Sequence, residues 1–77
     1  MQVTVVAFGH MTEVLGKRSL TLHNIPNTDQ LTLQLHRLYP ALNQIPYFMA
    51  IDQEIISGNV VLKNDTLIAL LPHHEST

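Results

Sequence analysis

The sequence predicts an α+β domain in which one main helix packs on one face of a mixed sheet of four to five strands. Three observations point to this fold class. Apolar runs of strand length stand near both ends of the chain, at residues 2–8 and 67–71. Residues 18–23 alternate with a period of two, and residues 28–39 have the spacing of an amphipathic helix. With so few elements, one helix laid across one sheet is the simplest way to bury the apolar faces.

The N-terminal part of the chain supplies two strands joined by a helical turn. Residues 2–8 are predicted to form a buried strand because they are apolar and β-branched, and Gly9 ends it. Residues 10–15 are expected to form one helical turn that stops at Gly16. The alternation of residues 18–23 is typical of a strand with one solvent-facing side. We therefore expect the two strands to be neighbours.

The main helix is predicted over residues 28–39. Asn27 can cap its first turn, and Gln30 follows three residues later, as in a capping box. Leucines at helical spacing predict one apolar stripe that faces the sheet. These leucines are Leu31, Leu35 and Leu38. Pro40 is expected to end the helix because a proline inside it would lose a backbone hydrogen bond.

The C-terminal part of the chain is predicted to add three strands. Residues 41–46 read as a connection, residues 47–51 as a strand, and residues 54–56 as a short strand that follows a turn. A polar turn at residues 63–66 leads into the last strand, residues 67–71.

The element order favours the β-grasp, or ubiquitin-like, arrangement. The first and last strands are expected to lie side by side in the middle of the sheet, because the most apolar strands need the most cover. The stripe on the helix would then cover the sheet face that carries Leu20 and Leu22.

The composition is that of one small domain, residues 1–77. The chain has no cysteine, so neither a disulfide framework nor a thiolate zinc site is expected. Only 13% of its residues are charged, against about 25% in an average globular protein. We expect that a partner covers part of the surface; the alternative is a slightly sticky monomer.

Charge and targeting signals argue against two classes of partner. The net charge is −2, and the four basic residues form no stripe that could follow a nucleic-acid backbone. No segment has the features of a signal peptide, and no apolar run approaches the roughly 20 residues of a membrane span. We therefore expect a cytoplasmic protein with no nucleic-acid or membrane partner.

The histidines do not predict a metal site. His73 and His74 are adjacent, so in an extended tail they would point in opposite directions. His36 has no metal ligand four residues away on either side. We therefore expect no bound metal, and we expect His10, His23 and His36 to be surface residues.

The chain also lacks the parts of an enzyme active site. It has no cysteine nucleophile and no Gly-x-Ser-x-Gly motif. Its glycines, Gly9, Gly16 and Gly58, are scattered as in turns and do not form a phosphate-binding loop. The sequence therefore argues against an enzyme that carries its own active site, and we expect no cofactor.

Three segments together resemble a known family. Residues 8–16 are similar to its Phe-Ala-x-x-Arg-Glu-x-x-Gly, and residues 49–55 to its Ala-Val-Asn-x-x-x-Val. Residues 62–72 are similar to its Leu-x-Asp-Gly-Asp-x-Val-Ala-Phe-Phe-Pro. The family is the MoaD/ThiS-type β-grasp sulfur carriers, which include the small subunit of molybdopterin synthase. The resemblance covers nearly the whole chain, although Thr12 replaces the family's arginine and Asp52 its asparagine.

The resemblance implies a function that works through the C-terminal tail, residues 72–77. In the family, an activating enzyme adenylates the terminal carboxylate, and sulfur transfer converts it to a thiocarboxylate. A large synthase subunit then takes up the tail and uses the sulfur for molybdenum-cofactor biosynthesis. By this resemblance Thr77 would contribute the carboxylate, and residues 72–76 would give it reach.

The tail departs from the family at its last two positions. Family members end in Gly-Gly, which passes through a narrow tunnel without a Cβ clash, whereas this chain has Ser76 and the stiff, β-branched Thr77. Three explanations are open: a divergent carrier, a β-grasp interaction module that has lost sulfur transfer, or a chain without its native end. The pathway is also open: molybdopterin, thiamin or another product that requires sulfur.

The resemblance further implies a partner-binding surface. Phe8, Ile55 and Leu71 occupy apolar positions that face the activating enzyme or the large subunit in the family. The tail is expected to complete this surface. Its residues are Pro72, His73, His74, Glu75 and Ser76. The alternative is that Phe8, Ile55 and Leu71 all lie in the core.

Overall fold

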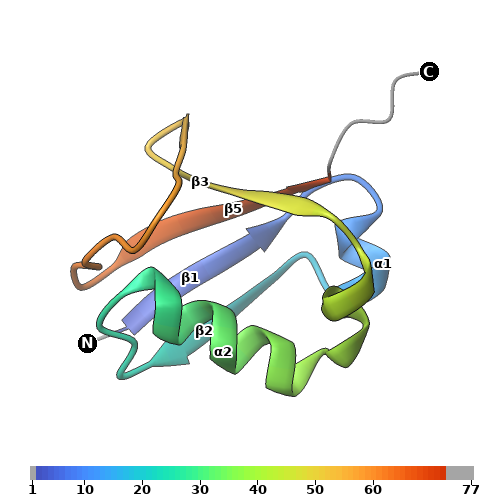
Figure 1. The fold of residues 1–77 in the computed structure, drawn as a ribbon, viewed down its shortest axis with the longest axis horizontal. Coiled ribbons are helices and arrows are strands. Elements are labelled where there is room, and N and C mark those ends of the chain that lie inside the picture. The colour runs from blue at the N-terminus through green and yellow to red at the C-terminus, as the bar shows by residue number, and fades with distance from the viewer. Residues whose placement is uncertain (1, 73–77) are drawn as a thin grey trace.

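The computed structural model describes residues 2–72, which form a five-stranded sheet with helices packed against it (Figure 1). The strands are β1 (Gln2–Ala7), β2 (Ser19–His23), β3 (Tyr47–Ile51), β4 (Glu54–Ile55) and β5 (Thr66–Pro72). The helices are α1 (Met11–Leu15), α2 (Thr28–Leu38) and the short 3-10 helix η1 (Pro40–Gln44). The strand order is β2-β1-β5-β3-β4, which confirms the predicted β-grasp fold.

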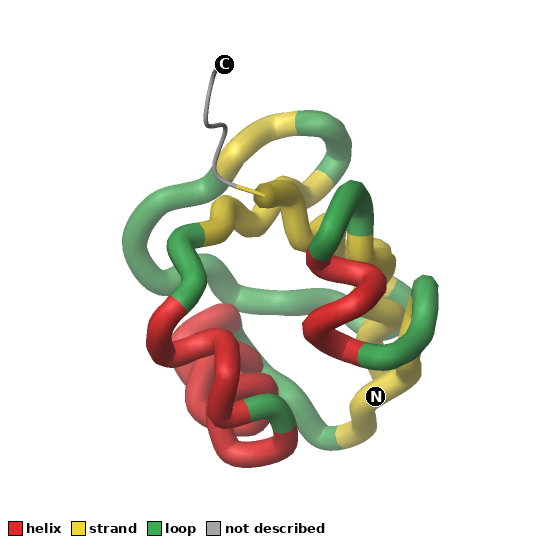
Figure 2. The backbone as a smooth tube through the Cα atoms, turned by 90° about the vertical axis from the view of Figure 1, so that its right-hand side faces the viewer, coloured by secondary structure: helices red, strands yellow, loops and turns green. Residues whose placement is uncertain are grey.

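The first and last strands of the sheet lie side by side at its centre, as predicted. β1 and β5 are parallel, with Val3 opposite Thr66 and Ala7 opposite Leu70. β2 pairs antiparallel with the outer side of β1, and β3 pairs antiparallel with the outer side of β5. Figure 2, turned by 90°, shows the strands and α2 as two layers, with only one face of the sheet covered by that helix.

The core lies between the sheet and the helices. Alternate residues of β1 and β5 face α2, because successive side chains of a strand point to opposite faces. The fully buried residues that meet there are Val3, Val5, Leu31, Leu35, Ile68 and Leu70. Burying one such side chain stabilises the fold by about 1.5–3 kcal/mol. Leu20 and Leu22 of β2 pack against this cluster, as predicted.

The end of the main helix differs from the prediction. Leu31 and Leu35 are buried, but Leu38 is 47% exposed. The helix ends at Leu38, and Tyr39 has non-helical backbone angles. Pro40–Gln44 form η1 with Pro40 in its first turn, so most of the expected connection, residues 41–46, is helical. After the turn at Tyr39, η1 contributes Leu42 to the core.

Several local signals act as the sequence indicates. The backbone N–H of Gln30 donates to Oδ1 of Asn27 over 2.9 Å, which caps α2. Gly16 has a φ of 75° and ends α1 in the left-handed conformation that favours glycine. Asp52 and Gln53, with φ of 54° and 69°, form the two-residue turn between β3 and β4. Two positive φ values in succession are typical of a type I′ turn.

The last described residue belongs to the sheet. Pro72, which we expected to begin the tail, is the final residue of β5 and lies opposite Tyr47 of β3. The expected functional residues His73, His74, Glu75, Ser76 and Thr77 lie outside the described residues. Within residues 2–72, none of the helices combines the length and the apolar character needed to cross a lipid bilayer.

Candidate functional site

The sheet face opposite α2 is largely apolar. Residues of four strands that alternate with the core residues point to this face. The apolar residues on it are Val6, Phe8, Phe48, Ala50, Ile55, Leu67, Ala69 and Leu71. β2 instead contributes the exposed polar residues Ser19, Thr21 and His23. We call the apolar part, which spans β1, β5, β3 and β4, the open face.

The open face contains a hollow of about 550 Å³. Its lining includes the three apolar residues that the sequence predicted as partner-binding, Phe8, Ile55 and Leu71. Phe8 is 48% and Ile55 58% exposed, so the alternative that both lie in the core is wrong. Leu71 is half-buried at the end of β5. Their position is now known, and their role in binding stays a prediction.

Leu67 belongs to the same hollow and was missed from the sequence. It is 59% exposed and lies on β5 four residues before Leu71. Residues 67–71 are all apolar, so hydropathy alone did not show which side chains face the core. The period of two along a strand would have predicted that Leu67 belongs to this surface, because Leu67, Ala69 and Leu71 must share one face.

Two alanines explain why this face is hollow. Ala69 of β5 lies between Val6 of β1 and Ala50 of β3, and Ala50 in turn lies opposite Ile55. Neighbouring side chains across a sheet normally fill the space between them. A pair of adjacent alanines leaves that space open, and the larger side chains around the pair become its walls.

Among the residues that the structure describes, the hollow has one charged residue at its edge. Asp52 and Gln53, in the turn after β3, supply the polar part of its lining. None of the lining residues is a lysine or arginine. An apolar centre with a polar edge is the composition of a protein-binding surface.

The loop after β1 braces the end of β5 beside this surface. The backbone N–H of Phe8 donates to the carbonyl oxygen of Leu70 over 3.0 Å. Gly9 has a φ of 57°, and a Cβ added to it would lie 3.0 Å from Cγ of Pro72. The described chain therefore ends at a fixed point next to Phe8 and Leu71.

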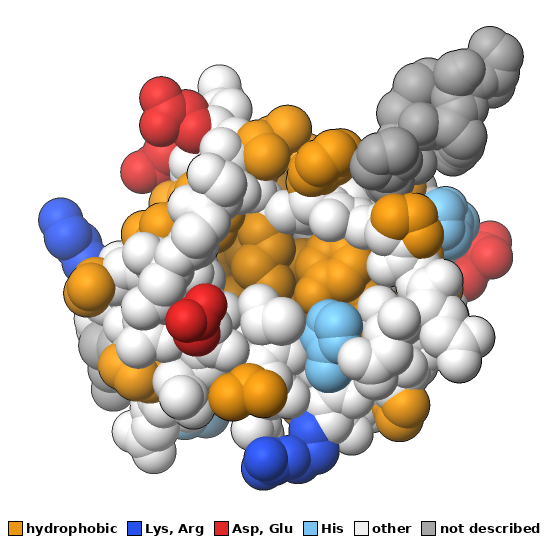
Figure 3. Space-filling view, viewed as in Figure 1, with side chains coloured by type: hydrophobic (Ala, Val, Ile, Leu, Met, Phe, Trp, Pro, Cys, Tyr) orange, Lys and Arg blue, Asp and Glu red, His pale blue; other side chains and the backbone are white. Residues whose placement is uncertain are grey.

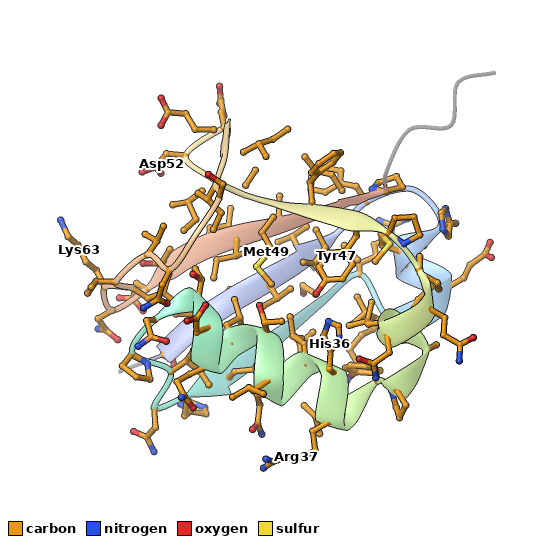
Figure 4. All side chains as sticks on the ribbon, viewed as in Figure 1. His36, Arg37, Tyr47, Met49, Asp52 and Lys63 are labelled. Carbon is orange, nitrogen blue, oxygen red and sulfur yellow. The ribbon has the colours of Figure 1, made fainter. Side chains whose placement is uncertain are left out.

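A cluster of polar side chains joins α2, η1 and β3 away from the open face. His36 makes two hydrogen bonds of 2.6 Å, one between its Nδ1 and Oδ1 of Asn43 and one between its Nε2 and Oη of Tyr47. Figure 4 shows His36 and Tyr47 pointing toward each other. The His36 side chain is partly buried, whereas His10 and His23 are exposed, as expected.

The hydrogen-bond network assigns the proton positions in this cluster. Nδ2 of Asn43 donates to the carbonyl oxygen of Pro40 over 3.2 Å, which leaves its Oδ1 as the acceptor toward His36. Nδ1 of His36 therefore donates, and Nε2 accepts the hydroxyl proton of Tyr47. Burial raises the pKa of the Tyr47 phenol above its usual 10.0. The cluster holds the start of β3 against the end of α2.

The rest of the described chain offers little other chemistry. In residues 2–72, no three His, Asp or Glu side chains gather as a metal-binding group. The open face is therefore the feature of the described residues that best suits a function.

Comparisons with known proteins support the fold. The first structure, from Pyrococcus furiosus and described as a candidate molybdopterin converting factor, subunit 1, has a TM-score of 0.83 at 13% identity. The alignment covers 94% of this chain and 97% of that one. Small archaeal modifier protein 1 from Haloferax volcanii has a TM-score of 0.81 at 15% identity, with both chains covered completely.

The small archaeal modifier protein 1 from Methanosarcina acetivorans has a TM-score of 0.82 at 21% identity. That alignment covers 99% of this chain and 96% of that one. No family model matches the sequence. No curated protein matches it either. At these identities the likeness establishes the β-grasp fold.

Proposed function

We propose that this protein is a small sulfur carrier of the molybdopterin-synthase small-subunit type, acting in molybdenum-cofactor biosynthesis in the cytoplasm. The observation that carries the proposal is the position of the end of β5. Pro72 is held against Gly9 at the border of the open face, next to Phe8 and Leu71. A partner docked on that face would therefore meet the segment that follows Pro72.

The open face would serve both partners that the proposal requires. An adenylating activating enzyme and a large synthase-like subunit would each cover the apolar hollow, and each would receive the C-terminal segment in its own active site. Covering Phe8, Ile55 and Leu67, which are about half-exposed or more, would remove apolar surface from water at a gain of roughly 25 cal/mol per Å². The low fraction of charged residues, 13%, agrees with a surface that is covered by a partner for part of the time.

The proposed chemistry takes place at the carboxylate of Thr77. A carboxylate oxygen attacks the α-phosphorus of ATP and pyrophosphate leaves. Hydrosulfide then attacks the acyl carbon, AMP leaves, and a thiocarboxylate remains. Residues 73–77 could carry the group at most about 17 Å beyond Pro72, since an extended chain spans about 3.4 Å per residue. The protein supplies the reacting group and the reach, and the activating enzyme supplies the catalysis.

Intact-mass measurement tests the proposal directly. The protein is incubated with ATP, a MoaD/ThiS-type activating enzyme and inorganic sulfide, and is then weighed. We expect a mass gain equal to the exchange of one oxygen for one sulfur. The matched control carries Ser76→Gly and Thr77→Gly together, which should raise the yield because glycine removes the Cβ clash. An unchanged mass for both proteins, with a Gly-Gly carrier charged in parallel, would reject sulfur carriage.

The second candidate is a ubiquitin-like interaction module without sulfur transfer. The specific observation in its favour is that the open face is complete within residues 2–72, while Ser76 and Thr77 replace the glycine pair of carriers. Two of the similar structures are described as modifier proteins, which agrees with a role in binding other proteins. In this case the native mass stays unchanged, although partners still bind the open face.

A further inference from the structure

We propose that the first half of β3 is a second binding site, which accepts a short, uncharged, extended segment of a partner protein as an added strand. β4 pairs with Ala50 and Ile51, at the end of β3, but it does not extend along the beginning of that strand. The chain turns away at Gly58, which has a φ of 75°. This site lies on the α2 side of the sheet edge, and binding there is independent of the proposed sulfur carriage.

The backbone of this half of β3 presents hydrogen-bonding groups to the outside. The N–H of Ile56 donates to the carbonyl oxygen of Met49 over 2.9 Å, so the backbone groups of Met49 point away from β5. Tyr47, two residues earlier, has the same orientation because hydrogen-bonding directions alternate along a strand. Among the described residues, none pairs with the N–H of Met49 or with the backbone N–H and C=O of Tyr47. Exposed edges of this kind are the templates for strand addition.

A groove runs beside these groups, between β3 and α2. Figure 3 shows it as a hollow near the centre of the molecule, with hydrophobic side chains visible inside. Its volume is about 230 Å³. The lining residues are Thr28, Thr32, Tyr47, Phe48, Met49, Ile56, Ser57 and Gly58. Small-molecule sites are usually about 300–1,000 Å³, so the groove suits a single side chain of a peptide better than a whole ligand.

Both walls of the groove are held in place by hydrogen bonds. On one side, Oη of Tyr47 donates to Nε2 of His36 over 2.6 Å and fixes the Tyr47 ring. On the other, Oγ1 of Thr28 donates to the carbonyl oxygen of Gly58 over 3.3 Å and accepts from the N–H of Val60 over 2.9 Å. A site formed before binding loses less conformational freedom when a peptide enters it.

The chemistry of the site selects its occupant. The backbone N–H and C=O of Tyr47 and the N–H of Met49, which have no partner among the described residues, match a peptide backbone in extended conformation. Alternate side chains of that peptide would point into the groove. None of the lining residues is charged, so a charged side chain would lose its hydration there without gaining a partner. The occupant that complements this site is therefore a neutral β-strand segment with an aliphatic residue.

A peptide titration tests the proposal. The probe is the blocked peptide acetyl-Thr-Ile-Thr-Val-Thr-amide, added to the full-length protein labelled with nitrogen-15. We expect saturable shifts of the Tyr47 and Met49 amide signals and slower hydrogen exchange at Met49. The same peptide with N-methyl groups on alternate amides should bind at least about tenfold more weakly, because each lost hydrogen bond costs roughly 1 kcal/mol and 1.4 kcal/mol is tenfold.

A protein variant supplies the second control. Thr32→Lys places a charge at the groove on α2 and should weaken peptide binding at least tenfold. Gln30→Lys adds the same charge to an exposed position of α2 outside the groove and should leave binding unchanged. Equal binding by both variants, or equal binding of the N-methylated peptide, would overturn the proposal. Protection of Met49 that rises with protein concentration alone would also overturn it, because the occupant would then be a second copy of the chain.

Discussion

Single residues with left-handed backbone angles shape both edges of the open face. Asp52 and Gln53 turn the chain from β3 into β4, which places Ile55 opposite Ala50. Gly9 allows the loop after β1 to approach Pro72. A residue with a Cβ is strained at such angles by about 1 kcal/mol or more. Substitutions at these positions should therefore change the free energy of unfolding measurably.

Gln53→Gly should stabilise the protein. Gln53 has a φ of 69°, at the second position of a type I′ turn, where glycine is strongly preferred. Relief of the strain should exceed the entropy that glycine adds to the unfolded chain, so the free energy of unfolding should rise by about 0.5–1 kcal/mol. Urea denaturation measures this change. Gln53→Ala keeps the Cβ and is the control; an equal gain from both variants would show that strain is not the cause.

Gly9→Ala should destabilise the protein by about 1–3 kcal/mol. The alanine would be strained by the positive φ of this position, and its Cβ would also crowd the Pro72 side chain. The new Cβ would lie 3.0 Å from Cγ of Pro72. Gly58→Ala is the matched control, since its φ is 75° but nothing lies within 4 Å of the added Cβ. Comparison of the two variants by urea denaturation isolates the contact with Pro72. Equal destabilisation would mean that Gly9 matters only for its backbone angle.

Among the elements, α2 and β3 are joined by the chain between them and by one polar cluster. The short helix η1 brings Leu42 into the core and Asn43 to His36. The sequence signals for α2 were strong at its start, where Asn27 caps the helix, and weak at its end. Hydrophobic spacing predicted that Leu38, the last residue of α2, would be buried, but the spacing does not reveal the turn at Tyr39, and Leu38 is 47% exposed. A tertiary hydrogen bond such as His36–Tyr47 leaves no periodic signal at all.

Tyr47→Phe tests the polar cluster through pH. A tyrosine in the unfolded chain loses its proton near pH 10, whereas burial raises the pKa of Tyr47 in the folded protein. As pH rises above about 10, the unfolded state therefore loses this proton first, and the free energy of unfolding falls. The contribution is complete below the unfolded pKa and is lost as pH rises through the folded pKa.

Removal of the phenol should make the free energy of unfolding fall less steeply above pH 10. At neutral pH the same variant should cost about 1 kcal/mol, because Nε2 of His36 loses its donor. Denaturant unfolding at several pH values measures both effects, with Tyr39→Phe as the variant that removes a phenol elsewhere. An unaltered pH profile in Tyr47→Phe would show that burial does not raise the pKa of the Tyr47 phenol, and an unchanged free energy of unfolding at neutral pH would show that the cluster does not contribute to stability.

At the scale of the whole molecule, one covered and one open sheet face account for the unusual composition. The chain has few charges because one face is core and a large part of the other is apolar. The sequence was sufficient to predict the order of elements, the central pair of strands and three residues of the open face. It was not sufficient for Leu67 or for the groove beside β3, because those depend on which neighbours the register and the chain turns bring together.

Ile55→Lys should weaken binding of the activating enzyme at least tenfold while leaving the fold intact. Ile55 is 58% exposed in the open face, and a buried lysine in a docked complex would be left without a partner. The change in stability should stay within about 0.5 kcal/mol, as for most surface substitutions. Leu33→Lys, at 57% exposure on α2, is the matched control. Calorimetric titration of the enzyme with each variant decides whether the open face is the docking surface.

The parallel pairing of β1 with β5 has a consequence for biosynthesis. Val3 finds its partner only when Thr66 has been made, so the centre of the sheet closes late during translation and depends on contacts of long sequence separation. A nascent or truncated chain that stops before residue 66 lacks β5, and with it the buried side chains of Ile68 and Leu70 in the core. The open face, to which β5 contributes Leu67, Ala69 and Leu71, is therefore complete only after the last strand has been made.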